Sequence, residues 1–287
     1  MNDLVWERQP EVHHRVLVAA FAGYFDAASA STGALDWLVE HSGATRLAHI
    51  EPDDFFDFQQ LRPQVVLEDG VTRQIVWPEN IVHVTEHLGP DRDLVMLSGI
   101  EPHVHWRQFC AVLLDVADRA SCEMVVTLGA TPAQVPHTRM PPVFGSSTNT
   151  ALAARLGLSR PQYEGITGLA GVLHVELDRA GLPAIAMRVG VPHYATGAHN
   201  PKAAMALLRN LEHVTGVPTG HAELGEVVDE WERQLDEAVA EDADARSYIP
   251  RLEAHFDRQA EDQIPTPDDL AEEFERFLQD PPDDEAP

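Results

Sequence analysis

The chain has 287 residues, enough to bury a sizeable core in one large domain or in one domain with an appendage. Its formal net charge of −27 argues against a surface that binds nucleic acid or an anionic membrane. It has no apolar run of about 18 residues that could span a membrane, and its first residues lack the pattern of a secretory signal. Cys110 and Cys122 lie in apolar patterns without metal-ligand spacing, which indicates reduced thiols in a cytoplasmic protein.

The first elements have the pattern of a sheet that is covered on both faces. Residues 15–22 form a continuous apolar run of strand length. A turn over residues 23–26 follows, and Asp26 is expected to cap a helix that carries Ala30, Ala34 and Leu38 on one stripe. Such a turn can receive an anion, but it lacks the Gly-x-Gly-x-x-Gly spacing of a dinucleotide site.

The next segment has the alternating pattern of antiparallel strands. After a strand expected at residues 46–50, three short runs at 65–67, 72–77 and 81–85 alternate apolar and polar residues. Turn residues at 68–70 and 78–80 separate these runs, so the sequence predicts a three-stranded β-meander. Such an insertion at a sheet edge can cover a neighbouring subunit.

The middle of the chain predicts a βαβ unit. Apolar runs at residues 94–97 and 124–128 flank a helical pattern at 106–117, which implies two parallel strands joined by a right-handed crossover. Helical patterns at 150–156, at 169–180 and from Pro201 to Leu211 surround a further strand at 185–191. The chain is therefore predicted to have an α/β fold.

Three of the expected strands run into loops that contain a Pro-His pair. If the strands are parallel neighbours, these loops share the sheet edge at which ligands usually bind. We therefore predict one ligand-binding edge, with His103 and His105 beside it. Its candidate residues are Tyr24, Asp26, Glu101, His137, Thr138, Arg139, Glu164, His193 and Tyr194.

Several chemistries fit this group of residues. Imidazoles and carboxylates could bind a metal, or they could act as general acids and bases while Arg139 holds a carboxylate or phosphate. Alternatively, the histidines hydrogen-bond loop carbonyls, and Arg139 pairs with Glu101 or Glu164. Without a His-Glu-x-x-His or Gly-x-Ser-x-Gly motif, we assign no metal and no cofactor. If the chain is an enzyme, the catalytic candidates are Glu101, His137, Arg139 and His193.

The C-terminal part is strongly acidic. Residues 221–287 contain 23 acidic and 5 basic residues, a net charge of −18, which leaves −9 for the rest of the chain. Amphipathic helical patterns at 224–239, 248–256 and 266–278 require a surface to pack on, and residues 280–287 are expected to be disordered. We predict an α/β domain at 1–215, an acidic helical extension at 216–279 and a tail at 280–287.

Six motifs occur in the order found in the proteasome assembly chaperone 2 family, and the chain most resembles its actinobacterial-type members. The motifs lie at residues 21–27, 57–63, 99–106, 135–139, 163–168 and 192–203, within a resemblance that covers roughly residues 13–215. The chain departs from the family at four positions. Tyr24 and Ala28 replace Trp and Gly, and Met140 and Ile166 replace Pro.

The resemblance implies a three-layer α/β/α sandwich similar to the phosphorylase/hydrolase-like fold, and it implies oligomers. Archaeal and eukaryotic relatives assist proteasome α-ring assembly, partly through a hydrophobic-Tyr-x C-terminus that residues 283–287 do not have. We therefore expect a non-enzymatic, homo-oligomeric protein-binding or small-ligand-binding protein. The alternatives are a hydrolase or phosphorylase-like enzyme, and an acidic helical arm that binds a basic partner protein.

Overall fold

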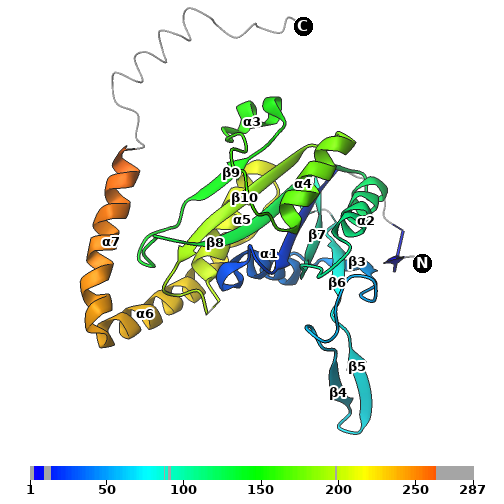
Figure 1. Cartoon of the computed structure of the whole chain (residues 1–287), viewed down its shortest axis with the longest axis horizontal. Helices are drawn as coiled ribbons and strands as arrows, with labels where there is room; N and C mark the ends of the chain where they lie inside the picture. Colours follow the sequence, from blue (N-terminus) through cyan, green and yellow to red (C-terminus); the bar gives the residue numbers. More distant parts are fainter. Residues whose placement is uncertain (1–2, 10–13, 87, 90–91, 198, 263–287) are drawn as a thin grey trace, which may run out of the picture.

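The computed structural model describes residues 3–9, 14–86, 88–89, 92–197 and 199–262 (Figure 1). It has a mixed α/β fold built on an eight-stranded sheet with the order β1-β3-β6-β7-β2-β8-β10-β9. These strands are β1 (Leu4–Trp6), β2 (Arg15–Ala22), β3 (Thr45–Ile50), β6 (Asn80–Val84), β7 (Asp93–Ile100), β8 (Cys122–Ala133), β9 (Val143–Ser146) and β10 (Ala184–Pro192). The helices are α1 (Ala30–His41), α2 (Trp106–Arg119), α3 (Thr150–Leu156), α4 (Leu169–Ala180), α5 (Pro201–Thr215), α6 (Gly225–Glu241) and α7 (Ala243–Asp262), with short 3-10 turns at Ala27–Ser29 and His221–Leu224.

The four central strands, β7, β2, β8 and β10, are parallel to one another. The βαβ pattern predicted that β7 and β8 are parallel, and β2 lies between them in the sheet. Strand β2 pairs with β7 from Arg15 opposite Asp93 to Ala22 opposite Ile100. Their apolar runs are continuous because both faces of these strands are covered, and β2 is buried along nearly its whole length. All four strands end at the same edge of the sheet.

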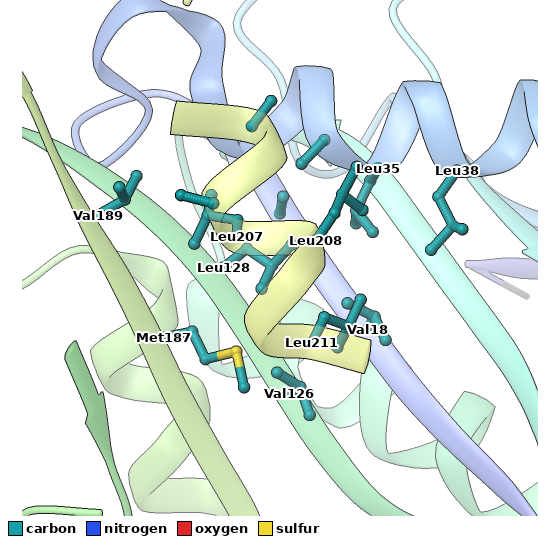
Figure 2. Close-up of a cluster of buried hydrophobic side chains, with 14 of the residues drawn as sticks. Val18, Leu35, Leu38, Val126, Leu128, Met187, Val189, Leu207, Leu208 and Leu211 are labelled. Carbon is teal, nitrogen blue, oxygen red and sulfur yellow. The ribbon is translucent and has the colours of Figure 1, made fainter. Parts of the chain in front are cut away.

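Separate hydrophobic cores form on the two faces of the sheet. Helices α1 and α5 cover one face, where leucines of both helices pack against alternate residues of the central strands (Figure 2). Helices α2 and α4 cover the other face, where Phe109, Leu113 and Leu173 are buried. Cys110 and Cys122 are buried free thiols, and burial raises the pKa of each to about 12. They are inert core residues in this environment.

The predicted three-stranded meander is wrong in its last strand. Strands β4 (Gln64–Glu68) and β5 (Thr72–Val76) form a separate hairpin that projects from the sheet (Figure 1). Strand β6 instead enters the main sheet between β3 and β7. Its alternate residues are buried, and Asn80 is fixed because its side chain bonds both the N–H (2.6 Å) and the carbonyl (3.2 Å) of Ile100. Short-range alternation identified the strands but not their partners.

Two of the expected C-terminal helices are present. Helices α6 and α7 extend away from the sheet beyond α5 (Figure 1). The helix expected at residues 266–278 and the tail at 280–287 lie outside the described residues. No helix within the described ranges is long and apolar enough to cross a membrane.

Candidate functional site

The candidate residues lie at the carboxyl ends of the parallel strands, but they form two separate clusters. The turn at residues 23–26 follows β2, Glu101 follows β7, His137 lies beyond β8, and His193 directly follows β10. The strand order puts β8 next to β10, whereas β2 separates β8 from β7. The loops that carry His137 and His193 are therefore neighbours, and the loop that carries His103 is not next to either.

The first group, which we call the Glu101 cluster, consists of Tyr24, Glu101 and Leu169. The Glu101 carboxylate accepts the backbone N–H of Leu169 at 2.6 Å, on the first residue of α4, and that of Tyr24 at 3.3 Å. A Cβ at position 23 would lie 2.6 Å from Glu101 Oε2, so glycine is needed there for this approach. Glu101 thus caps a helix whose N-terminal N–H groups favour a negative charge.

Asp26 has a similar structural role at the start of α1, as the sequence predicted. Its carboxylate accepts the backbone N–H groups of Ser31 (2.9 Å) and Thr32 (3.1 Å) and the hydroxyls of both residues (2.6 and 2.5 Å). The turn before α1 contains Ala28 at φ 56°, in the left-handed region. That conformation favours glycine, so an alanine at this position carries some backbone strain.

The second group, the His137 cluster, joins the loop after β8 to the C-terminal helices. His137 is only 1% exposed. The Tyr194 hydroxyl lies 2.8 Å from both the backbone nitrogen and the Nδ1 of His137, and Nε2 lies 3.1 Å from Asp236 of α6. One assignment satisfies every group: Tyr194 accepts the backbone N–H and donates to Nδ1, and Nε2–H donates to Asp236. Burial raises the pKa of Tyr194 to about 12, which keeps this hydroxyl protonated.

Thr138 and Arg139 extend the same contact to α7. Arg139 forms a two-pronged ion pair with Asp257, with both N···O distances 3.0 Å, and lies 3.6 Å from Glu253. Glu253 also accepts the Thr138 hydroxyl. The hydrogen bond from Arg139 lowers the pKa of Asp257 and raises that of Arg139. The predicted pairing of Arg139 with Glu101 or Glu164 is therefore wrong, because the carboxylates of α7 occupy its guanidinium.

The remaining histidines of these loops are held by local contacts. His193 Nδ1 lies 3.1 Å from the Ala133 carbonyl, and its Nε2 lies 3.4 Å from the Tyr248 hydroxyl of α7. His103 Nδ1 accepts the backbone N–H of Asp57 at 3.0 Å, and His105 is an exposed residue that precedes α2. These contacts match the structural alternative, in which histidines keep loops in place.

Glu164 joins neither cluster. It is exposed and forms no hydrogen bond or ion pair with a described residue. Within the described part of the chain, no group of three or more His, Cys, Asp or Glu residues could hold a metal ion. The polar side chains of the two clusters thus bind one another or the backbone. They form helix caps in the Glu101 cluster and ion pairs in the His137 cluster.

Several residues of the His137 cluster were not predicted. Lys202 is 5% exposed, donates to the His137 carbonyl at 2.7 Å and pairs with Glu232 of α6. It is the only lysine in the chain, and a lone lysine inside an apolar helix stripe was a signal for a buried ion pair. Asp236, Glu253 and Asp257 gave no such signal, because many other acidic residues surround them in the sequence.

The comparison with family models and the comparison with solved structures agree on one family. The PAC2 family model matches residues 20–239. A PAC2 family protein from Streptomyces avermitilis is 38% identical, with a TM-score of 0.77, over 83% of this chain and 99% of that chain. A proteasome-assembly chaperone homologue from Mycobacterium tuberculosis is 40% identical, with a TM-score of 0.74, over 82% and 99%. No curated protein matches the sequence.

A more distant structure has the same fold. The archaeal proteasome activator PbaB of Pyrococcus furiosus is 17% identical, with a TM-score of 0.64, and the match covers 83% of this chain and 99% of that chain.

Proposed function

The chain belongs to the PAC2 family, and from this premise we propose that it is a homo-oligomeric, assembly-chaperone-like protein that binds other proteins and catalyses no reaction. The observation that carries the proposal is the β4–β5 hairpin, which stands clear of the sheet (Figure 1). We further assign the chain to the phosphorylase/hydrolase-like α/β/α sandwiches, because helices cover both faces of its parallel strands. The free buried cysteines support a cytoplasmic location.

The hairpin presents apolar side chains to solvent. Val65 and Ile75 face each other across the two strands, and Leu67 lies on the same face two residues further along β4. Their exposed fractions are 60%, 49% and 58%. A two-stranded hairpin is marginally stable in water by itself, so an apolar arm of this kind is suited to being covered by a partner. At its base, Trp77 packs against Phe58 with ring centroids 4.8 Å apart, which holds the arm in place.

The partner we propose for this arm is a second copy of the chain. A charge substitution tests it: Val65→Glu should lower the solution mass measured by light scattering to that of a smaller species. Val175→Glu is the matched control, because Val175 is 50% exposed on α4 and lies outside the hairpin. If Val65→Glu leaves the mass of the wild-type protein unchanged, or if the wild-type protein is already a monomer, the hairpin does not join copies of this chain.

The enzyme alternative has weaker support. Its candidates Glu101 and His137 belong to different clusters, and Arg139 is paired with Asp257. Helices α6 and α7 contact the loop after β8 through three carboxylates, and a fourth, Glu232, pairs with Lys202 of α5. These contacts support treating residues 216–279 as an acidic extension docked on the domain at 1–215. With these carboxylates engaged in that docking, a basic partner protein would have to use other acidic residues of α6 and α7.

A further inference from the structure

A groove beside the edge strand β9 differs in charge from the rest of the molecule. It has a volume of about 310 Å³ and lies between β9, β10 and the loop at residues 159–163. Its lining includes Phe144, Ser146, Ser159, Arg160, Tyr163 and Arg188. No aspartate or glutamate lines it, although the chain has 47 acidic residues against 20 basic ones. The groove is therefore a local basic site on an acidic protein.

The two arginines of the groove are available to a ligand. Arg188 is half-buried on β10, and its guanidinium lies 4.6 Å above the Phe25 ring and close enough to His174 to act on it electrostatically. It forms no hydrogen bond or ion pair with a described residue. Arg160 is exposed and has no hydrogen bond or ion pair with a described residue. The nearby carboxylate of Glu101 is occupied by the N–H groups of Leu169 and Tyr24. A guanidinium without a partner presents a planar set of donors that matches a carboxylate or phosphate.

Two exposed aromatic rings border the same groove. Phe144 is 61% exposed and is the cross-strand partner of Arg188, so the two side chains share one face of the sheet. Tyr163 is 71% exposed, and its hydroxyl donates to the Ile166 carbonyl at 3.0 Å, which restrains the ring at the rim. Such rings can stack on a planar group while the arginines hold an anion.

We propose that this groove binds a small organic anion that carries both a planar ring and a carboxylate or phosphate. The groove volume is at the lower end of the range for small-molecule sites, roughly 300–1,000 Å³, which fits one ring and its anionic group. Arg188 and Arg160 hold the anion, and Phe144 or Tyr163 packs on the ring. The proposal is independent of the hairpin and of the oligomer, because none of its residues belongs to the hairpin.

The proposal is tested by titrating the full-length protein with adenosine monophosphate and with benzoate and following binding by ligand-observed NMR. The two probes distinguish a phosphate ligand from a carboxylate ligand. We expect saturable binding of at least one of them. Adenosine, which lacks the anion, and inorganic phosphate, which lacks the ring, should each bind at least about tenfold more weakly than adenosine monophosphate if that is the ligand that binds. Absence of saturable binding for both anions at millimolar concentration overturns the proposal.

Matched variants locate the binding. Arg188→Gln and Arg160→Gln should each weaken binding about tenfold or more, whereas Arg188→Lys should retain part of it. Arg107→Gln, an identical change at an exposed position of α2, should leave binding unchanged. Arg160 is exposed, so its substitution should not affect folding. The Arg160→Gln variant therefore still tests the proposal if Arg188→Gln disturbs the contact with Phe25. Equal affinity in wild type and in the Arg160→Gln variant contradicts the proposal.

Discussion

The Glu101 cluster and the His137 cluster occupy the same edge of one sheet, yet they stabilise different things. Glu101 accepts backbone N–H groups from elements of the α/β core, so its hydrogen bonds stabilise the folded core itself. The His137 cluster binds the carboxylates of two later helices, and its outer members, Arg139 and Asp257, remain partly exposed to solvent. The comparison shows that loops at the same edge of one sheet can either stabilise the core or hold C-terminal helices against it.

Acid should affect the core before it affects the appendage. His174 of α4 is half-buried, with its Nε2 2.7 Å from the Thr127 hydroxyl, and the loss of solvation of its ring lowers its pKa to about 4. The unfolded chain binds this proton from its ordinary pKa of 6.5 downward, so stability is full above pH 6.5 and decreases until about pH 4. The loss from this group should reach about 3 kcal/mol. Urea unfolding at several pH values measures it.

The variant His174→Gln is the control for that experiment. Glutamine is neutral at every pH and can still hydrogen-bond Thr127. The dependence of unfolding free energy on pH between 6.5 and 4 should become distinctly shallower in this variant. An unchanged slope would mean that other groups cause the acid sensitivity.

Glu101→Ala addresses the core side of the comparison. It removes the acceptor of the Leu169 and Tyr24 N–H groups, and loss of such a cap should lower the free energy of unfolding by about 1–2 kcal/mol. The substitution Glu164→Ala should change it by less than about 0.5 kcal/mol, because Glu164 is exposed and has no partner in the described chain. Equal effects of the two variants would remove the assigned role of Glu101.

Arg139→Gln has the smallest expected effect on global stability and the most local one. It breaks the two-pronged pair with Asp257, so amides of α7 should exchange faster with solvent while those of α4 keep the wild-type rate. In the wild type, α7 should be released only as the pH falls below the ordinary pKa of 3.8 of Asp257, because Arg139 lowers that pKa further. High salt should weaken the same contact. Hydrogen exchange read by mass spectrometry, with Arg107→Gln as control, measures all three effects.

An equal increase in the amide exchange rates of α4 and α7 in the Arg139→Gln variant would contradict the comparison. In that case the two clusters would belong to one cooperative unit, and α7 would be part of the core rather than an appendage.

The sequence by itself determined the parallel centre of the sheet, the helices that cover it, and the family. Continuous apolar runs such as that of β2 and helical stripes such as that of α5 reflect burial, which depends on local composition. The cap formed by Asp26 was also predictable, because its partners are only five and six residues away along the chain.

Only the tertiary structure decided which polar groups meet. Asp257 is 118 residues from Arg139, and nothing in the local pattern distinguishes it from the other acids of α7. Glu101 and His137 both follow parallel strands, but the position of β2 between β7 and β8 keeps their loops apart. In the same way, β6 pairs with β3 and β7 rather than β5 because a buried position in the sheet stabilises it more than an exposed third strand. Long-range pairing depends on how the whole chain fills space, and the local sequence does not encode it.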